Sequence, residues 1–189
     1  IESNYIAFVI DTSGSMRNQN TAYMLPIVLK KVEETLAAYP LVKGIQVFDA
    51  NGNYVMGRSS FRKWIPDSPE IRKQIQRRLF RYPVPSQSNP VPGIIKAIRH
   101  LYDPDDPEMK MGIYVFGDEF TGLADSVLRR MDALNPKDEN GERGVTINAI
   151  GFPNVIHTSY SMGQTGLRFA NLMRELTYEH GGAFIVVAD

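Results

Sequence analysis

Three oxygen-bearing side chains stand at alternate positions directly after the first apolar run of the chain. Asp11, Ser13 and Ser15 follow the run at residues 5–10, and Gly14 gives the backbone the freedom to turn tightly between the two serines. A carboxylate and two hydroxyls supply only oxygen, which is the ligand atom that Mg²⁺, Mn²⁺ and Ca²⁺ prefer. The same residue types are also common helix N-caps, so these positions alone are consistent with either a metal site or a cap.

The pattern Asp-x-Ser-Gly-Ser after an apolar run resembles the metal-ion-dependent adhesion site of von Willebrand factor type A (VWA) domains. In that family a hydroxyl residue in a second loop and an Asp after a later strand complete the site. The second loop commonly reads Thr-x-Thr-x-x-Gly before an amphipathic helix. Here Ser88 precedes Gly93 by the same number of residues as the first Thr precedes the Gly of that pattern. Ser86 is the alternative position. The later Asp corresponds to Asp118, which is followed by Glu119 where the family usually has Gly.

The resemblance implies a divalent-metal-dependent protein-binding module for adhesion or assembly, similar to the VWA domains of many bacterial proteins. Because hydroxyls are neutral, a cation that they help to hold keeps positive charge, which favours an anionic oxygen from outside. We expect Mg²⁺, with Mn²⁺ or Ca²⁺ as alternatives, to bridge to an Asp or Glu carboxylate of a protein partner. Glu119 is expected to cap the following helix, or else to add negative charge beside the metal. The implied ligands are Asp11, Ser13, Ser15, Ser88 and Asp118.

Two other functions fit parts of the same sequence. One is an assembly module that works with an AAA+ ATPase or another partner without functional metal bridging. The other is phosphotransfer, because Asp11 stands as in the Asp-x-Asp loop of haloacid-dehalogenase-like phosphatases, but Ser13 replaces the second carboxylate, which acts as general acid. The chain has no phosphate-binding glycine loop, dinucleotide fingerprint or nucleophile elbow, and its three His residues lack metal-ligand spacing. We expect no enzymatic activity.

Length and composition predict a single domain over residues 1–189. The formal net charge is zero, which argues against a nucleic-acid-binding protein that neutralises phosphates. The chain has no Cys, and therefore no disulfide or thiolate zinc site. It has neither an apolar run of membrane-spanning length nor a signal-peptide pattern, so we expect a soluble domain that does not insert into membranes. Because the chain begins at Ile1 rather than Met, we expect a domain excised from a longer protein.

Apolar runs and helical patterns alternate along the whole chain. Asn51-Gly52 predicts a hairpin that makes the third strand antiparallel to the second, and spacings of three and four residues predict helices between the other strands. The pattern predicts an α/β fold with a doubly wound, mostly parallel six-stranded sheet in the order 3-2-1-4-5-6, flanked by helices on both faces. The six predicted strands are residues 5–10, 44–49, 54–56, 111–116, 145–150 and 183–187.

In this strand order the first and fourth strands are neighbours. Asp11 follows the first strand and Asp118 follows the fourth, so both carboxylates should reach the crevice at the carboxyl ends of the strands. Ligands bind at that crevice in doubly wound sheets. Independent helix caps would not be expected to converge there, so the strand order favours the metal site.

Two further segments carry exposed polar residues. The loop at residues 152–166 follows the fifth strand, so we expect it to lie on the rim of the site and to help select the partner. A helix that starts at Ser68-Pro69 has a basic face, which we interpret as a solvated surface rather than as a patch for an acidic partner. This basic face consists of Arg72, Lys73, Arg77, Arg78 and Arg81.

Overall fold

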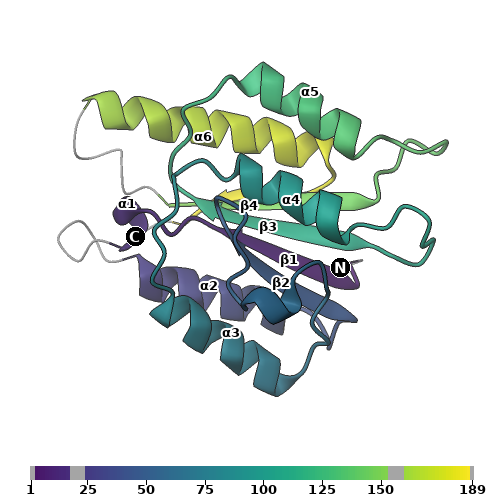
Figure 1. The fold of residues 1–189 in the computed structure, drawn as a ribbon. Helices are drawn as coiled ribbons and strands as arrows, with labels where there is room; N and C mark the ends of the chain where they lie inside the picture. The colour runs from purple at the N-terminus through teal and green to yellow at the C-terminus, as the bar shows by residue number, and fades with distance from the viewer. Residues whose placement is uncertain (1–2, 18–23, 153–159, 188–189) are drawn as a thin grey trace.

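The fold is a parallel sheet between two layers of helices (Figure 1), seen in a computed structural model that describes residues 3–17, 24–152 and 160–187. The sheet has the order β2-β1-β3-β4-β5, and every pairing between its strands is parallel. The strands are β1 (Tyr5–Ile10), β2 (Gly44–Asp49), β3 (Met111–Gly117), β4 (Val145–Gly151) and β5 (Phe184–Val186). The structure confirms the α/β class and the doubly wound order.

Helices cover both faces of the sheet, α2 and α3 on one and α4, α5 and α6 on the other (Figure 1). The helices are α1 (Gly14–Arg17), α2 (Leu25–Ala37), α3 (Pro69–Arg81), α4 (Val91–Leu101), α5 (Ala124–Leu134) and α6 (Tyr160–Glu179), with a 3-10 turn at Arg58–Ser60. Because both faces are covered, the interior strands β1 and β3 are each buried at all but one residue. Within the residues that the structure describes, no helix is long and apolar enough to cross a membrane.

The predicted third strand is the one departure from the expected sheet, which has five strands in the described residues. Residues 54–56 pair with β2 through an isolated antiparallel bridge between Tyr54 and Phe48 and a backbone hydrogen bond from the Val55 N–H to the Val47 carbonyl (3.0 Å). Gly57 then turns the chain away with a φ of 95°, a conformation that favours glycine, and a 3-10 turn follows. The hairpin pattern therefore forms, but its second arm is too short to extend the sheet.

Close packing fixes the start of α4 against the sheet. A Cβ atom on Gly93 would lie 2.6 Å from a methyl group of Val9 and 2.8 Å from the carbonyl oxygen of Asp49. The Gly93 N–H also donates a hydrogen bond to the carbonyl of Ala50 (2.9 Å). Only glycine fits this position without displacing β1 or the end of β2. The Gly of the second-loop pattern is therefore required here for packing.

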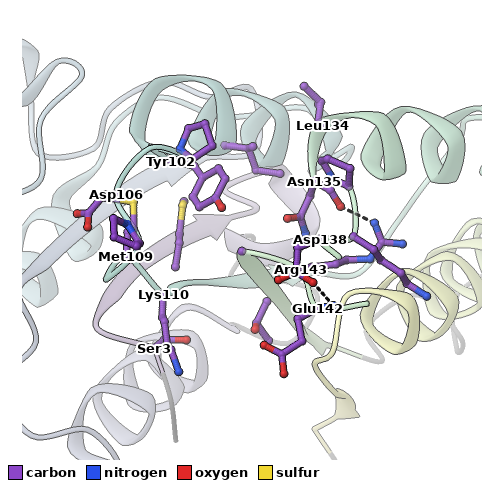
Figure 2. A pocket seen from close by; sticks show the side chains of 18 of the residues that line it. Ser3, Tyr102, Asp106, Met109, Lys110, Leu134, Asn135, Asp138, Glu142 and Arg143 are labelled. Carbon is purple, nitrogen blue, oxygen red and sulfur yellow. Dashed lines mark hydrogen bonds between the residues drawn. The ribbon is translucent and has the colours of Figure 1, made fainter. Parts of the chain in front are cut away.

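A buried polar cluster holds the opposite, amino-terminal edge of the sheet. The Asn135 side chain accepts from the Val145 N–H (3.1 Å) and donates to the Val145 carbonyl (2.6 Å) and to His180 Nδ1 (2.8 Å). Because Nδ1 accepts, the imidazole is neutral, and burial lowers the pKa of His180 to about 4. Asn135 also lines a cavity of about 680 Å³ beneath this edge, where Tyr102 and Arg143 lie among residues of both charges (Figure 2).

We predict that His180 makes the stability of the domain depend on pH in the acid range. Its pKa is lower in the folded than in the unfolded state, so the unfolded state binds more protons between pH 4 and 6.5, and stability is lost as the pH falls through this range. The wild type should lose about 1–3 kcal/mol more than His180→Asn between these pH values. Urea unfolding of both proteins at each pH measures the difference. An equal pH dependence of the two proteins would contradict the role of His180.

Candidate metal centre

Two buried carboxylates meet at the carboxyl edge of the sheet. β1 and β3 are neighbours in parallel register, with Ile10 opposite Phe116, and the Asp11 N–H extends this pairing by donating to the Phe116 carbonyl (2.8 Å). Asp118 follows β3 by one residue. The side chains of Asp11 and Asp118 are both 2% exposed, so two acidic groups from distant parts of the sequence share one buried place.

The loop after β1 is ordered by its own side chains. Asp11 Oδ1 accepts a hydrogen bond from the Ser13 N–H (2.7 Å), a turn that Asp side chains commonly stabilise. The hydroxyls of Ser13 and Ser15 lie 3.0 Å apart at the start of the single-turn helix α1. Ser15 is also close enough to Asp118 to lower its pKa. The structure therefore brings together four of the five residues that the sequence predicts for the site.

The second loop presents Ser86, rather than Ser88, to these residues. The Ser86 hydroxyl accepts from the Thr12 N–H (2.9 Å) and donates a longer hydrogen bond to Asp11 Oδ1 (3.4 Å), and the Ser86 N–H donates to the Thr12 hydroxyl (3.1 Å). Ser86 is buried, whereas Ser88 is half-buried. In the described part of the chain, no hydrogen bond joins Ser88 to Asp11 or to the other predicted ligands.

Three carboxylate oxygens of the site lack a hydrogen-bond partner in the part of the chain that the structure describes. They are Asp11 Oδ2 and both oxygens of Asp118, and all three are buried. A buried polar atom without a partner is costly, and such atoms in a folded protein call for an explanation such as an ion. A divalent cation fits these residues, because carboxylates and hydroxyls are oxygen donors. Among the described residues no three His, Cys, Asp or Glu side chains cluster as a metal site, so hydroxyls would have to complete this one.

Burial and mutual repulsion raise the pKa of both carboxyl groups. Burial raises the pKa of Asp11 to about 6, against the opposing effect of its hydrogen bonds with Ser13. Burial, followed by the charge of Asp11, raises the pKa of Asp118 to about 8, and Glu119 adds to this shift. Two like charges in one buried place disfavour ionisation of both. A bound cation would reverse this by favouring the ionised forms.

Glu119 does not cap the next helix, contrary to the first of the two roles expected for it. Helix α5 begins only at Ala124, and its N-cap residue is Leu123, which makes no side-chain capping bond. Glu119 is half-buried beside Asp118 and raises the pKa of that carboxyl group. Its charge therefore acts on the site itself, which is the second of the two roles.

The predicted rim of the site is only partly described. The sequence predicts a partner-selecting loop over residues 152–166, but residues 160–166 already belong to helix α6, and residues 153–159 lie outside the described residues. Phe152, where the loop begins, is buried and packs in the core on the α2 and α3 side of the sheet. The role of this loop stays a prediction.

Comparison with solved structures identifies the fold. A structure described as von Willebrand factor type A from Catenulispora acidiphila matches with a TM-score of 0.68 and 13% identity, covering 100% of this chain and 39% of that chain. An aerotolerance-related membrane protein from Bacteroides fragilis NCTC 9343 matches with a TM-score of 0.62 and 15% identity, covering 98% and 92%. The SpRpn10 VWA domain matches with a TM-score of 0.58 and 13% identity, covering 98% and 88%.

These matches concern the fold and not the chemistry of the site, because the identities are low. The chain spans only 39% of the length of the Catenulispora acidiphila protein. No protein-family model and no curated protein sequence matches the chain. The residues of the site must therefore be judged by their own geometry.

We predict that Asp118→Asn stabilises the protein in the absence of divalent cations. The raised pKa of Asp118 means that stability is fully present below pH 4 and is lost as the pH rises through about 8, and the amide removes this loss. At pH 8 in EDTA the variant should exceed the wild type by about 1–3 kcal/mol. This corresponds to roughly 2–4 °C in Tm for each kcal/mol in a domain of this size.

The matched control is Asp105→Asn, which removes an exposed carboxylate from the loop before β3 and should leave the Tm unchanged. Differential scanning calorimetry in EDTA measures all three proteins. A lower Tm for Asp118→Asn than for the wild type at pH 8 would mean that the carboxylate stabilises the metal-free fold, against this prediction.

Proposed function

We propose that this chain, which has the fold of a von Willebrand factor type A domain, is a divalent-metal-dependent protein-binding module. The observation that carries the proposal is the group of three buried, unpartnered carboxylate oxygens at the carboxyl edge of the sheet, beside hydroxyl groups. The proposed ligands are Asp11, Ser13, Ser15, Asp118 and one serine of the second loop.

The chemistry of these ligands favours binding an acidic group from outside. Mg²⁺ prefers six oxygen ligands and keeps waters where the protein does not reach, so an exchangeable position would remain for an anionic oxygen. Asp11 and Asp118 supply the negative charge, while the hydroxyls of Ser13 and Ser15 are neutral donors. We propose that an Asp or Glu carboxylate of a protein partner takes the exchangeable position.

The same geometry supports binding rather than catalysis. Phosphotransfer of the haloacid-dehalogenase type would need a carboxylate at Ser13 as general acid. The Ser13 hydroxyl instead lies against the Ser15 hydroxyl, and its N–H is used by Asp11. We therefore propose a non-enzymatic role.

Mg²⁺ should raise the stability of the wild-type protein. A ligand at about 100 times its Kd adds roughly 2.7 kcal/mol, which corresponds to about 5–11 °C in Tm. Asp11→Ala should abolish this increase, because it removes a carboxylate ligand, while Asp105→Ala should retain it. Thermal melts in Mg²⁺ and in EDTA, with calorimetric titration of the metal alone, measure the effect. An equal Mg²⁺ response of Asp11→Ala and wild type would refute the metal site.

The two serines of the second loop give the same titration a finer outcome. If Ser86 is the ligand, Ser86→Ala should weaken Mg²⁺ binding while Ser88→Ala leaves it unchanged, and the reverse result would identify Ser88.

A short peptide with a single Glu should bind to the protein only in Mg²⁺, and the same peptide with Gln in place of Glu should not bind. Partner binding that persists in EDTA would favour a metal-free assembly module.

A further inference from the structure

A groove of about 650 Å³ lies along helix α3, on the side that faces the segment after β2. One wall is formed by Tyr54 and Val55. The other is formed by α3, which contributes Arg77, Arg78 and Arg81 together with Glu70 and Gln74. In an α-helix these three arginines, at spacings of one, three and four residues, project from one side. The groove thus combines an apolar wall with three cations and one carboxylate, which leaves its lining net positive.

The arginines of α3 divide into two kinds. Arg72 is part of the fold, because it pairs with Asp67 (2.6 Å) and donates to the carbonyls of Leu36 (2.7 Å) and Pro40 (3.0 Å). In the described part of the chain, the three groove arginines Arg77, Arg78 and Arg81 make no ion pair. Arg72 is therefore occupied within the fold, whereas the other three arginines are exposed, as expected for a solvated basic face.

One end of the groove lies next to the loop of the candidate metal centre. Val84 lines the groove, and its carbonyl accepts a hydrogen bond from the Thr12 hydroxyl (2.9 Å), which stands between Asp11 and Ser13 in the chain. The carboxyl end of α3 lies at the same edge of the sheet as α1, and the chain leaving α3 passes α1 on its way to α4 (Figure 1).

The chemistry of the groove selects an acidic protein segment. Three exposed guanidinium groups favour carboxylates, which arginine binds through paired N–H groups. The apolar wall, with Val84 41% exposed, favours side chains such as Leu or Tyr between the acidic residues. The formal net charge of the chain is zero, so the molecule as a whole does not attract a polyanion such as a nucleic acid.

We infer that the groove binds an acidic segment of the same protein partner whose carboxylate reaches the site at Asp11 and Asp118. This inference rests on the proposed function, because it takes the partner to be a protein that presents carboxylates. The groove supplies charge complementarity and apolar contact, and the metal centre supplies the bridging contact.

The test measures the groove without the metal. A short fluorescein-labelled peptide in which Glu alternates with Leu is titrated with the protein in EDTA at low salt, and fluorescence anisotropy gives its Kd. Arg77→Glu/Arg78→Glu/Arg81→Glu should weaken binding by about tenfold or more, because three attractive contacts become repulsive. The matched control reverses three exposed arginines on the opposite face, Arg129→Glu/Arg130→Glu/Arg174→Glu, and should change the Kd by less than about threefold.

Three outcomes would overturn the inference. The first is equal binding by the wild type and the groove variant, and the second is equal binding of a peptide in which Gln replaces Glu. The third is tighter binding of a sulfated oligosaccharide or a single-stranded oligonucleotide through the same arginines, since that would assign the groove to another class of ligand. The neutral variant Arg77→Gln/Arg78→Gln/Arg81→Gln, with an unchanged melting curve, separates a loss of binding from a loss of folding.

Failure of the groove and failure of the proposed function remain distinguishable. If the groove variant binds the Glu peptide as the wild type does, while Mg²⁺ still strengthens binding in both, only the groove assignment falls. If the groove variant weakens binding in EDTA but Mg²⁺ strengthens it in neither protein, the metal bridge fails, and with it the assignment of one shared partner.

Discussion

The repulsion between two buried carboxylates is the constraint on which this structure depends. Parallel pairing of β1 with β3 brings Asp11 and Asp118 to one edge, and burial there removes the water that would otherwise separate their charges. The fold has to compensate either by keeping a proton or by binding a cation. Among the described residues both Asp118 oxygens lack a hydrogen-bond partner, so the surrounding loops do not by themselves offset the repulsion.

Much of this arrangement can be predicted from the sequence, because it depends on the order of strands and helices along the chain and not on the positions of individual side chains. The alternation of strands and helices determines which strands are neighbours, and that places Asp11 beside Asp118 before any side-chain position is known. The third strand could not be predicted in the same way. Whether residues 54–56 extend a sheet depends on how far they remain paired, and the positive φ of Gly57 ends the pairing.

In the second loop the residue offset and the observed contacts point to different serines. The offset from Gly93 selects Ser88, but the path of the loop is set by prolines at positions 83 and 85. A residue before proline is held extended, so Tyr82 and Val84 carry the chain along Thr12 and bring Ser86 to Asp11. The offset from Gly93 by itself contains no information about the path of the loop. The prediction that Glu119 caps the following helix is wrong because α5 begins five residues beyond it.

The close fit of Gly93 has a mechanical consequence for the same loop. Its downstream end is fixed where α4 touches Val9 and the carbonyl of Asp49, and its upstream end is fixed where the Tyr82 hydroxyl donates to the Asp49 carboxylate (2.9 Å). Both contacts are to the strands β1 and β2, so the loop is held to the sheet at each of its ends. A rearrangement that exchanged Ser86 for Ser88 would therefore have to take place within the segment between these two contacts.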